Sequence, residues 1–180
     1  MSQLQICRLP KDVTAGQFTC GVESIDDMVY RSYFTTILQH AYAYEVSSKN
    51  IVLGYYMIVF QNINLDEYPE EISEYKDLLE YGTSAYIKYI AVDKRYQGHK
   101  IGTSILDQII KRVFTLAADW PIRLITLDAI RDKYDWYKRM GFKALDESKL
   151  AAGDFTIAMY MDCIKSKKDI EDYIERQVMI

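Results

Sequence analysis

The chain has few of the residues that cross-link or interrupt small proteins: three cysteines, two histidines and three prolines among 180 residues. The cysteines are odd in number and widely spaced, and no Cys-x-x-Cys pair occurs. The sequence therefore predicts neither a disulfide framework nor a zinc site, and we expect no metal. Reduced cysteines in a cytoplasmic protein are the interpretation that this pattern favours.

Long apolar runs are also missing. No stretch approaches the roughly 20 apolar residues that a membrane helix needs, and residues 1–10 lack the charged and then apolar layout of a signal peptide. Neither linkers nor repeats divide the chain, and its 49% hydrophobic and 27% charged residues are typical of a globular protein. The sequence predicts a single domain over residues 1–180, with no membrane partner.

Acidic and basic side chains occupy different parts of the chain. Residues 66–80 hold seven Asp and Glu against one Lys, whereas residues 88–143 hold twelve Lys and Arg against six Asp and no Glu. This asymmetry favours an anion site in the basic region, and either a solvated helix face or a cation-attracting rim in the acidic one. The net charge of −4 argues against an extended nucleic-acid footprint.

The hydrophobic pattern switches repeatedly between the periods of strands and helices, which predicts a mixed α/β fold. Predicted strands cover Leu4–Leu9, Tyr42–Val46, Ile51–Phe60, Ala85–Val92, Ile122–Leu127, Phe142–Leu145 and Phe155–Asp162. Predicted helices cover Asp26–Gln39, a stretch from Pro69 to Leu79, Ile101–Leu116, Asp132–Met140 and Lys165–Met179. Residues 47–50 read as a hairpin turn, and residues 165–180 as a C-terminal helical extension.

The most informative segment is residues 89–103. A β-rich strand leads into a short loop with Gly98 and Gly102 and then into a helix. Glycines let backbone N–H groups turn toward a ligand, and a helix N-terminus adds unpaired donors and a positive dipole end, which suit a phosphate. Arg95 and Lys100 add positive charge. The loop matches neither a Walker A nor a G-x-G-x-x-G pattern, and a structural turn is the alternative on glycine count alone.

In full context, Gln97-Gly98-His99-Lys100-Ile101-Gly102 resembles the Q/R-x-x-G-x-G/A signature of the GNAT N-acetyltransferase superfamily. Lys100 stands where the family usually has glycine. The resemblance implies a GNAT-like fold, with a central, mostly antiparallel sheet flanked by helices, and acetyl-CoA as cosubstrate. It assigns cofactor binding to the strand end, the loop and the helix start: Ala91, Val92, Gln97, Gly98, His99, Lys100, Ile101, Gly102 and Thr103.

A second segment, residues 136–142 (Trp-Tyr-Lys-Arg-Met-Gly-Phe), resembles the (F/L)Y-x-x-x-GF helix end of the same superfamily. The resemblance implies that Tyr137 is the catalytic general acid, which protonates the departing CoA thiolate. Ile130 and Lys133 stand where the family usually has Asn and Ala. The resemblance therefore speaks more for contacts to the phosphates of CoA than for contacts to its pantetheine arm.

Two shorter patterns resemble one branch of the superfamily. Residues 18–26 and Gly54-Tyr55-Tyr56 follow its F-x-x-G-x-x-x-L-D and GYY motifs. That branch includes the GNAT-type toxins of bacterial toxin–antitoxin pairs, which acetylate the amino group of aminoacyl-tRNA. The resemblance implies an aminoacyl-tRNA as acceptor and an antitoxin as partner.

If the loop binds acetyl-CoA, the N–H groups of Ala91 or Val92 would polarise the thioester carbonyl as an oxyanion hole does. The predicted strand Ala85–Val92 holds no Asp or Glu, although many members of the family place a base there. Glu45, Asp128 and the acids of residues 66–80 are candidate bases by chemistry alone. An α-amino group, with a pKa of about 7.7–8.0, needs less help than a lysine-type amine at about 10.4. This favours an α-amine acceptor.

Two alternatives stay open. The acceptor is a small or peptidic amine, attracted by the acids of residues 66–80, or the protein binds CoA or a partner protein without catalysis. The C-terminal helix either packs on its own domain or docks an antitoxin or the second subunit of a homodimer. Its candidate contact residues are Ile170, Tyr173, Ile174 and Val178.

Overall fold

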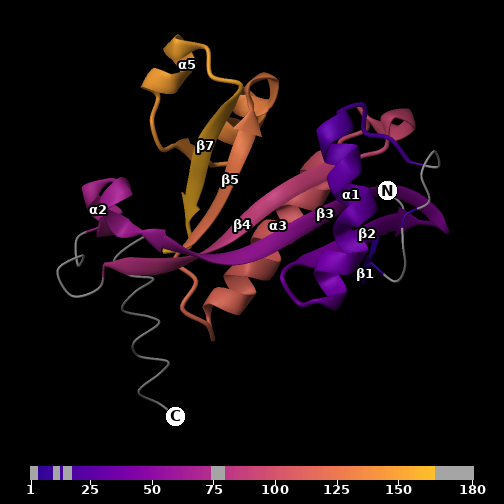
Figure 1. Ribbon diagram of the computed structural model, residues 1–180, viewed down its shortest axis with the longest axis horizontal. Helices are drawn as coiled ribbons and strands as arrows, with labels where there is room; N and C mark the ends of the chain where they lie inside the picture. Colours follow the sequence, from indigo (N-terminus) through magenta and orange to yellow (C-terminus); the bar gives the residue numbers. More distant parts are fainter. Residues whose placement is uncertain (1–3, 10–12, 14–17, 74–79, 165–180) are drawn as a thin grey trace. The chain divides into compact units, whose positions relative to one another are not determined.

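The protein is a mixed α/β structure built on one sheet, as the computed structural model of residues 4–9, 13, 18–73 and 80–164 describes (Figure 1). Seven strands of these residues follow the order β1-β2-β3-β4-β5-β7-β6. They are β1 Gln5–Arg8, β2 Tyr42–Ser48, β3 Ile51–Asn64, β4 Tyr81–Val92, β5 Leu124–Ile130, β6 Lys143–Ala144 and β7 Thr156–Asp162. The helices are α1 Glu23–Ile37, α2 Glu70–Ser73, α3 Ile101–Ala117, α4 Tyr134–Arg139 and α5 Ser148–Ala152, with 3-10 turns η1 Leu65–Glu67, η2 Lys94–Tyr96 and η3 Arg131–Lys133.

The sheet is mostly antiparallel, which confirms the expected fold class. β1 and β3 pair antiparallel with β2, and β5 and β6 pair antiparallel with β7. β4 and β5 run parallel. Two side-chain bonds show this: Ser84 pairs with Thr126, and Tyr86 pairs with Asp128, so the residue numbers of both strands increase in the same direction. Helix α3 connects these two strands, as a parallel pair requires.

The chain divides into two compact units, Met1–Phe60 with Ile87–Lys111, and Gln61–Tyr86 with Arg112–Ile180. The core of the first unit is assembled from the sheet, from the segment before α1 and from α1 itself. Its buried members are Leu9, Phe18, Val29, Ala41, Ala43, Tyr55, Met57, Tyr89 and Ala91. The turn between β2 and β3 places Lys49 and Asn50 at φ angles of 49° and 62°, the left-handed values that a two-residue hairpin of the favoured kind requires.

In the second unit, the buried cluster joins the end of β3 and the first acidic turns to β5 and β7. Its members are Ile63, Leu65, Ile72, Leu124 and Tyr160. Beside it, the Arg123 guanidinium donates through Nε and Nη2 to the two carboxylate oxygens of Asp162, at 3.0 Å each. Both partners are only about a quarter exposed, so this two-point contact ties the start of β5 to the end of β7.

Several predicted bounds were wrong. β3 continues to Asn64, four residues past the apolar run, because its pairing with β4 continues beyond that run. Directly after β3, the amide of Leu65 bonds the carbonyl of Glu80, the residue before β4. Helix α1 begins earlier than expected, at Glu23. Helix α5 was not predicted, because five residues are too few to show a period.

The described residues test other predictions only in part. Of the helix expected after Pro69, the structure describes α2 and no more, since residues 74–79 lie outside the described part. The expected C-terminal helix over residues 165–180 also lies outside it, and the single domain stays a prediction. Within the described residues, no helix has the length and apolar character needed to cross a membrane.

Candidate functional site

The loop between β4 and α3 has two residues in the left-handed region, Gly98 at φ 79° and Lys100 at φ 61°. Glycine adopts this conformation without strain, whereas an L residue with a side chain loses roughly 1–2 kcal/mol there. Lys100 occupies the position at which the signature has glycine. The loop therefore keeps the backbone turn that a glycine would allow, although the side chain is a lysine. The left-handed conformation of Lys100 therefore accommodates a lysine at the glycine position of the signature.

Asp93 fixes the first turn of the loop. Its side chain is buried, with 2% of its surface exposed, and accepts hydrogen bonds from the amide and from Nε of Arg95 at 2.9 Å and from Nη2 at 2.7 Å. The bonds from Arg95 hold the pKa of this carboxyl below its usual range. The guanidinium, which the sequence suggested as a phosphate partner, is thus engaged with Asp93. An Asp directly after a strand and before a turn is the signal for such a cap.

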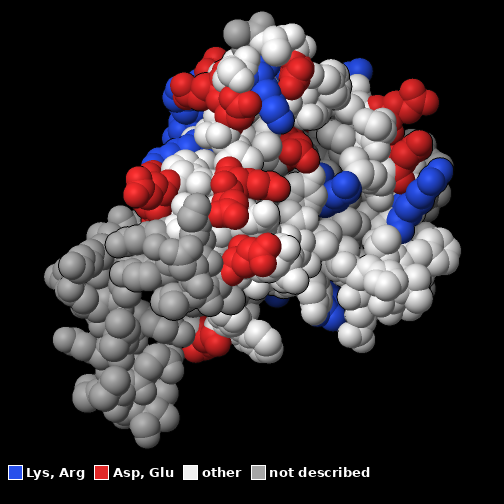
Figure 2. Space-filling view, turned by 60° about the vertical axis from the view of Figure 1, so that its left-hand side comes forward, with Lys and Arg blue, Asp and Glu red and all other residues white. Residues whose placement is uncertain are grey.

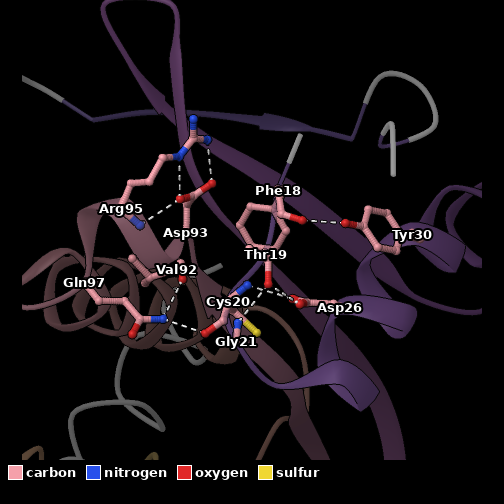
Figure 3. A network of polar contacts seen from close by, with 10 residues as sticks. All are labelled: Phe18, Thr19, Cys20, Gly21, Asp26, Tyr30, Val92, Asp93, Arg95 and Gln97. Carbon is pink, nitrogen blue, oxygen red and sulfur yellow. Dashed lines mark hydrogen bonds and ion pairs between the residues drawn. The ribbon is translucent and has the colours of Figure 1, made fainter. Parts of the chain in front are cut away.

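Gln97 joins the loop to a segment far away in the sequence. Its side-chain nitrogen donates to the carbonyl of Cys20 at 2.7 Å and to that of Val92 at 3.0 Å (Figure 3). The amide of Lys94 adds a third link, to the carbonyl of Thr19 at 2.8 Å. Gln97 therefore holds the loop in shape through backbone carbonyls of the first unit.

The partner segment has its own anchor. The carboxylate of Asp26, in the first turn of α1, accepts from the Thr19 hydroxyl at 2.6 Å and from the Cys20 amide at 2.8 Å (Figure 3). The Tyr30 hydroxyl donates to the carbonyl of Phe18. The buried ring of Phe18 packs edge-on against that of Tyr55, with 4.9 Å between the ring centroids. Asp26, the last residue of the F-x-x-G-x-x-x-L-D pattern, thus fixes the backbone of Thr19 and Cys20, and Cys20 is the residue whose carbonyl Gln97 bonds.

Burial and the neighbouring carboxylate make Cys20 a poor nucleophile. Desolvation, followed by the contact with Asp26, raises the pKa of this thiol to about 12. Because the thiolate is the reactive form, Cys20 is a structural residue at neutral pH. Within the described residues, no group of three or more His, Cys, Asp or Glu side chains is placed to hold a metal ion.

The start of α3 is suited to a phosphate. The first bond within the helix runs from the amide of Ser104 to the carbonyl of Lys100 at 3.0 Å. The N–H groups of the preceding turn are those that no helical carbonyl can reach. Its first turn holds no acid, and the exposed side chains of His99 and Lys100 stand directly before it. The arrangement favours an anion.

Gly54 of β3 lies against the end of β4. A Cβ atom added to Gly54 would stand 2.4 Å from the carbonyl oxygen of Ala91, a distance that no real side chain tolerates. The glycine of the GYY pattern therefore lets the two strands approach closely at the residue before Val92. Tyr56, two residues further along β3, is buried and stacks on Tyr44, with 4.9 Å between the ring centroids.

Tyr137 lies in α4 of the second unit, where its ring centroid is 4.5 Å from that of Trp136 and 5.8 Å from that of Phe142. Burial raises the pKa of its phenol to about 12, so the hydroxyl stays protonated throughout the physiological range. The amide of Phe142 bonds the carbonyl of Tyr137, which closes the helix around Gly141 at φ 95°. Tyr137 thus has the protonation state that a general acid needs.

The two single candidate bases each face a phenol. The carboxylate of Glu45 lies 3.5 Å from the hydroxyl of Tyr55, within the first unit. Asp128 accepts a shorter bond from the hydroxyl of Tyr86, at 2.8 Å, within the second unit. The second contact was not foreseen, because the parallel pairing of β4 and β5 cannot be read from either strand alone.

The acidic and basic segments meet in space. The carboxylate of Glu71, in the acidic segment, lies 3.4 Å from Nζ of Lys143, in the basic one. A second pair joins Lys138 to Glu147, which lies outside both segments, at 3.8 Å. Both pairs are well exposed and add little stability. Figure 2 shows acidic and basic side chains side by side on one face of the molecule.

A model of the acetyltransferase (GNAT) domain matches residues 39–144, more than half of the chain. The chain belongs to the GNAT acetyltransferase family. The match includes β4, the loop, α3 and Tyr137, and it makes the protein an acyl-CoA-dependent N-acyltransferase. No curated protein matches the chain in sequence.

Solved structures of GNAT-type toxins share the fold. A crystal structure of a tyrosine-to-phenylalanine mutant of KacT matches with a TM-score of 0.75 and 20% identity, over 94% of this chain and 98% of that one. AtaT complexed with acetyl-methionyl-tRNAfMet matches with a TM-score of 0.75 and 19% identity, over 94% and 98%. A mutant AtaT toxin bound to the C-terminus of the antitoxin AtaR and acetyl-CoA matches with a TM-score of 0.69 and 18% identity, over 89% and 94%.

Proposed function

We propose that the protein transfers an acetyl group from acetyl-CoA to the α-amino group of an aminoacyl-tRNA. The observation that carries the acyl-CoA part is the glycine-like turn of Lys100 at the start of α3, within a GNAT domain. The acceptor is supported by the likeness to AtaT complexed with acetyl-methionyl-tRNAfMet, which spans 94% of this chain.

The proposed cofactor site consists of Ala91, Val92 and residues 97–103. Acetyl-CoA brings a pyrophosphate and an activated acetyl group. The pyrophosphate would accept from the N–H groups at the start of α3, with the Lys100 ammonium as its nearest cation. The N–H groups at the end of β4 would bind the thioester oxygen, where negative charge develops as the amine attacks. Gln97 would support the site indirectly, since its amide is bonded to Cys20 and Val92.

Tyr137 is the proposed general acid. Its phenol carries its proton at every pH below about 12, and it would give that proton to the CoA thiolate as the C–S bond breaks. The acceptor must arrive as a neutral amine. An α-amino group, with a pKa of about 7.7–8.0, supplies a useful neutral fraction at cellular pH.

A calorimetric titration with acetyl-CoA, followed by release of free thiol, tests the proposal. We expect thiol release with aminoacyl-tRNA and none with the same tRNA after its amino acid is removed. Release that occurs only with small amines would replace the acceptor by a small or peptidic amine. Failure to bind acetyl-CoA would overturn the proposal as a whole.

A tRNA acceptor makes a further demand that a small amine does not. Contacts to phosphates release counterions, so affinity must fall steeply as salt rises. We expect the KM for aminoacyl-tRNA to rise between about 50 and 200 mM salt by a factor of ten or more. The KM for acetyl-CoA should change much less, and serves as the internal control. An antitoxin partner and a homodimer stay predictions.

A further inference from the structure

Tyr134, the first residue of α4, carries a buried hydroxyl that differs from the other buried polar groups of the protein. The residue has 7% of its surface exposed. Among the residues that the structure describes, its hydroxyl oxygen is the one buried side-chain nitrogen or oxygen atom without a hydrogen-bond partner. The buried phenol of Tyr89, by contrast, bonds the hydroxyl of Ser32.

The ring of Tyr134 is held in place by its surroundings. Its amide bonds the carbonyl of Arg131, which fixes the backbone at the start of the helix. The ammonium group of Lys138 lies over the ring, 5.6 Å from its centroid, and α4 packs against β5. A buried ring that is fixed in this way keeps its hydroxyl away from bulk water.

A hydroxyl in this position lowers the stability of the fold. A buried donor that leaves water and finds no acceptor loses its hydration without a replacement. Phenylalanine has the same ring and would fill the same space without that loss. If Tyr134 served packing alone, the hydroxyl would therefore be a cost with no return. Such a group points to a partner that the chain itself does not supply.

The position of Tyr134 on α4 indicates which partner this is. Tyr137, the proposed general acid, follows three residues later, and residues at this spacing share a helix face. Tyr134 is buried and Tyr137 is half-buried, whereas the exposed positions of the helix are Asp135, Lys138 and Arg139. The group that must reach Tyr137 is the sulfur of CoA. Two methylene groups separate this sulfur from the first amide of the pantetheine arm. An amide offers a donor and an acceptor, and a phenol can serve either.

We propose that the Tyr134 hydroxyl binds the pantetheine arm of acetyl-CoA at the amide nearest the sulfur. The inference rests on the proposed acyl transfer with Tyr137 as general acid, and it adds a residue that holds the cosubstrate next to its reacting end. Bound acetyl-CoA gives the phenol the hydrogen bond that no described residue provides. The same hydroxyl therefore lowers the stability of the free protein and raises its affinity for the cosubstrate.

Tyr134→Phe tests this role, because it keeps the ring and removes the hydroxyl. We expect two opposite effects. The Tm of the free protein should rise by about 2 °C or more, since the unmet hydrogen bond is gone. The affinity for acetyl-CoA, measured by calorimetry, should fall by about 3–10-fold, as for the loss of one hydrogen bond.

Tyr86→Phe is the matched control. It makes the same change in the same unit, but the hydroxyl of Tyr86 has a partner, Oδ2 of Asp128 at 2.8 Å. Its Tm should not rise, and its affinity for acetyl-CoA should stay within twofold of the parent protein. A rise in Tm equal to that of Tyr134→Phe would overturn the inference, because an unmet hydrogen bond would not then explain the gain.

ADP locates the contact on the cosubstrate. It carries an adenosine and a pyrophosphate, as acetyl-CoA does, but no pantetheine arm. Competition against acetyl-CoA gives its inhibition constant, which we expect to agree within twofold between the parent protein and Tyr134→Phe. An equal loss of affinity for ADP and for acetyl-CoA would assign Tyr134 to the fold and overturn the inference.

The outcomes also separate this inference from the function on which it rests. Parent protein that does not bind acetyl-CoA would overturn the proposed function and the inference together. Parent protein that binds acetyl-CoA and releases thiol, with an unchanged affinity in Tyr134→Phe, would overturn the inference alone. A lower Tm in Tyr134→Phe would show that the hydroxyl already has a partner in the free protein, such as a bound water, and would also overturn it.

Discussion

The side-chain nitrogen of Gln97 lies 2.7 Å from the carbonyl oxygen of Cys20, across 77 residues of sequence. The same nitrogen bonds the carbonyl of Val92 at 3.0 Å, so one amide joins the strand end, the loop and the segment before α1. The first residue of the GNAT signature acts here on the backbone that shapes the loop. Its contribution to acyl-CoA binding would then come through the geometry of the loop.

Replacing Gln97 by Ala removes both bonds. The side chain is exposed, so we expect a loss of about 1 kcal/mol in the free energy of unfolding. We also expect a several-fold loss of affinity for acetyl-CoA, because the loop is held less firmly. Gln108→Ala, at an exposed position of α3, is the control for removing a glutamine. Chemical denaturation and calorimetry measure the two effects, and equal behaviour of the two variants would contradict the account.

Lys100→Gly should stabilise the protein. Glycine removes the strain at φ 61°, which is worth about 1 kcal/mol, or roughly 2–4 °C in Tm for a chain of this length. Lys100→Ala loses the same charge but keeps the strained backbone, and should gain nothing in Tm. Both variants should bind acetyl-CoA more weakly at low salt, because both lose the ammonium group. A Tm for Lys100→Gly equal to that of Lys100→Ala would show that no strain is stored.

Gly54→Ala should destabilise the protein by about 1–3 kcal/mol, the usual effect of overpacking. The added methyl group meets the carbonyl oxygen of Ala91, which is backbone and cannot turn aside. Gly98→Ala is the contrast, since nothing lies within 4 Å of its added Cβ and only the left-handed φ opposes it. Urea unfolding compares the two. A smaller loss in Gly54→Ala than in Gly98→Ala would refute the close approach of the strands.

Tyr137→Phe should lower kcat by about 10²–10⁴-fold, the usual contribution of a general acid, with little change in the affinity for acetyl-CoA. The pKa of Tyr137 is raised to about 12, so its proton is present below that value and is lost as the pH rises through it. The rate of the parent protein should therefore rise with the neutral fraction of the acceptor amine and stay level up to about pH 11. An alkaline fall near pH 9 that disappears in Tyr137→Phe would show that the phenol titrates much lower than we infer.

Local sequence patterns predicted much of the fold. The hairpin was predicted over residues 47–50, between two β-rich runs. The structure confirms a turn there but limits it to Lys49 and Asn50, which both adopt the φ that such a turn needs, because Ser47 and Ser48 stay paired with β3. The irregularity between Val46 and Ser47 was not predicted, since the register shift depends on the pairing partner in β3. Likewise Gln61 and Asn62 extend β3 without any apolar signal, because pairing with another strand continues there.

In the candidate site, too, local sequence patterns predict some features, while others depend on contacts between distant residues. Lys100 at the helix start and Tyr137 before Gly141 follow from motifs read along the chain. The engagement of Arg95 with Asp93 could not be read in this way, because a buried carboxylate and an exposed one look the same in sequence. The contact between Tyr86 and Asp128 depends on parallel strands 42 residues apart, a register that no local pattern encodes.

The central claim is that the acetyl group of acetyl-CoA reaches an α-amino group on tRNA. The most direct test incubates the protein with acetyl-CoA labelled in the acetyl group and with methionyl-tRNA, and then identifies the labelled product by mass. We expect N-acetyl-methionine after hydrolysis of the tRNA ester, and no label on tRNA without its amino acid. Label found only on added small amines, or on none of these acceptors, would contradict the account.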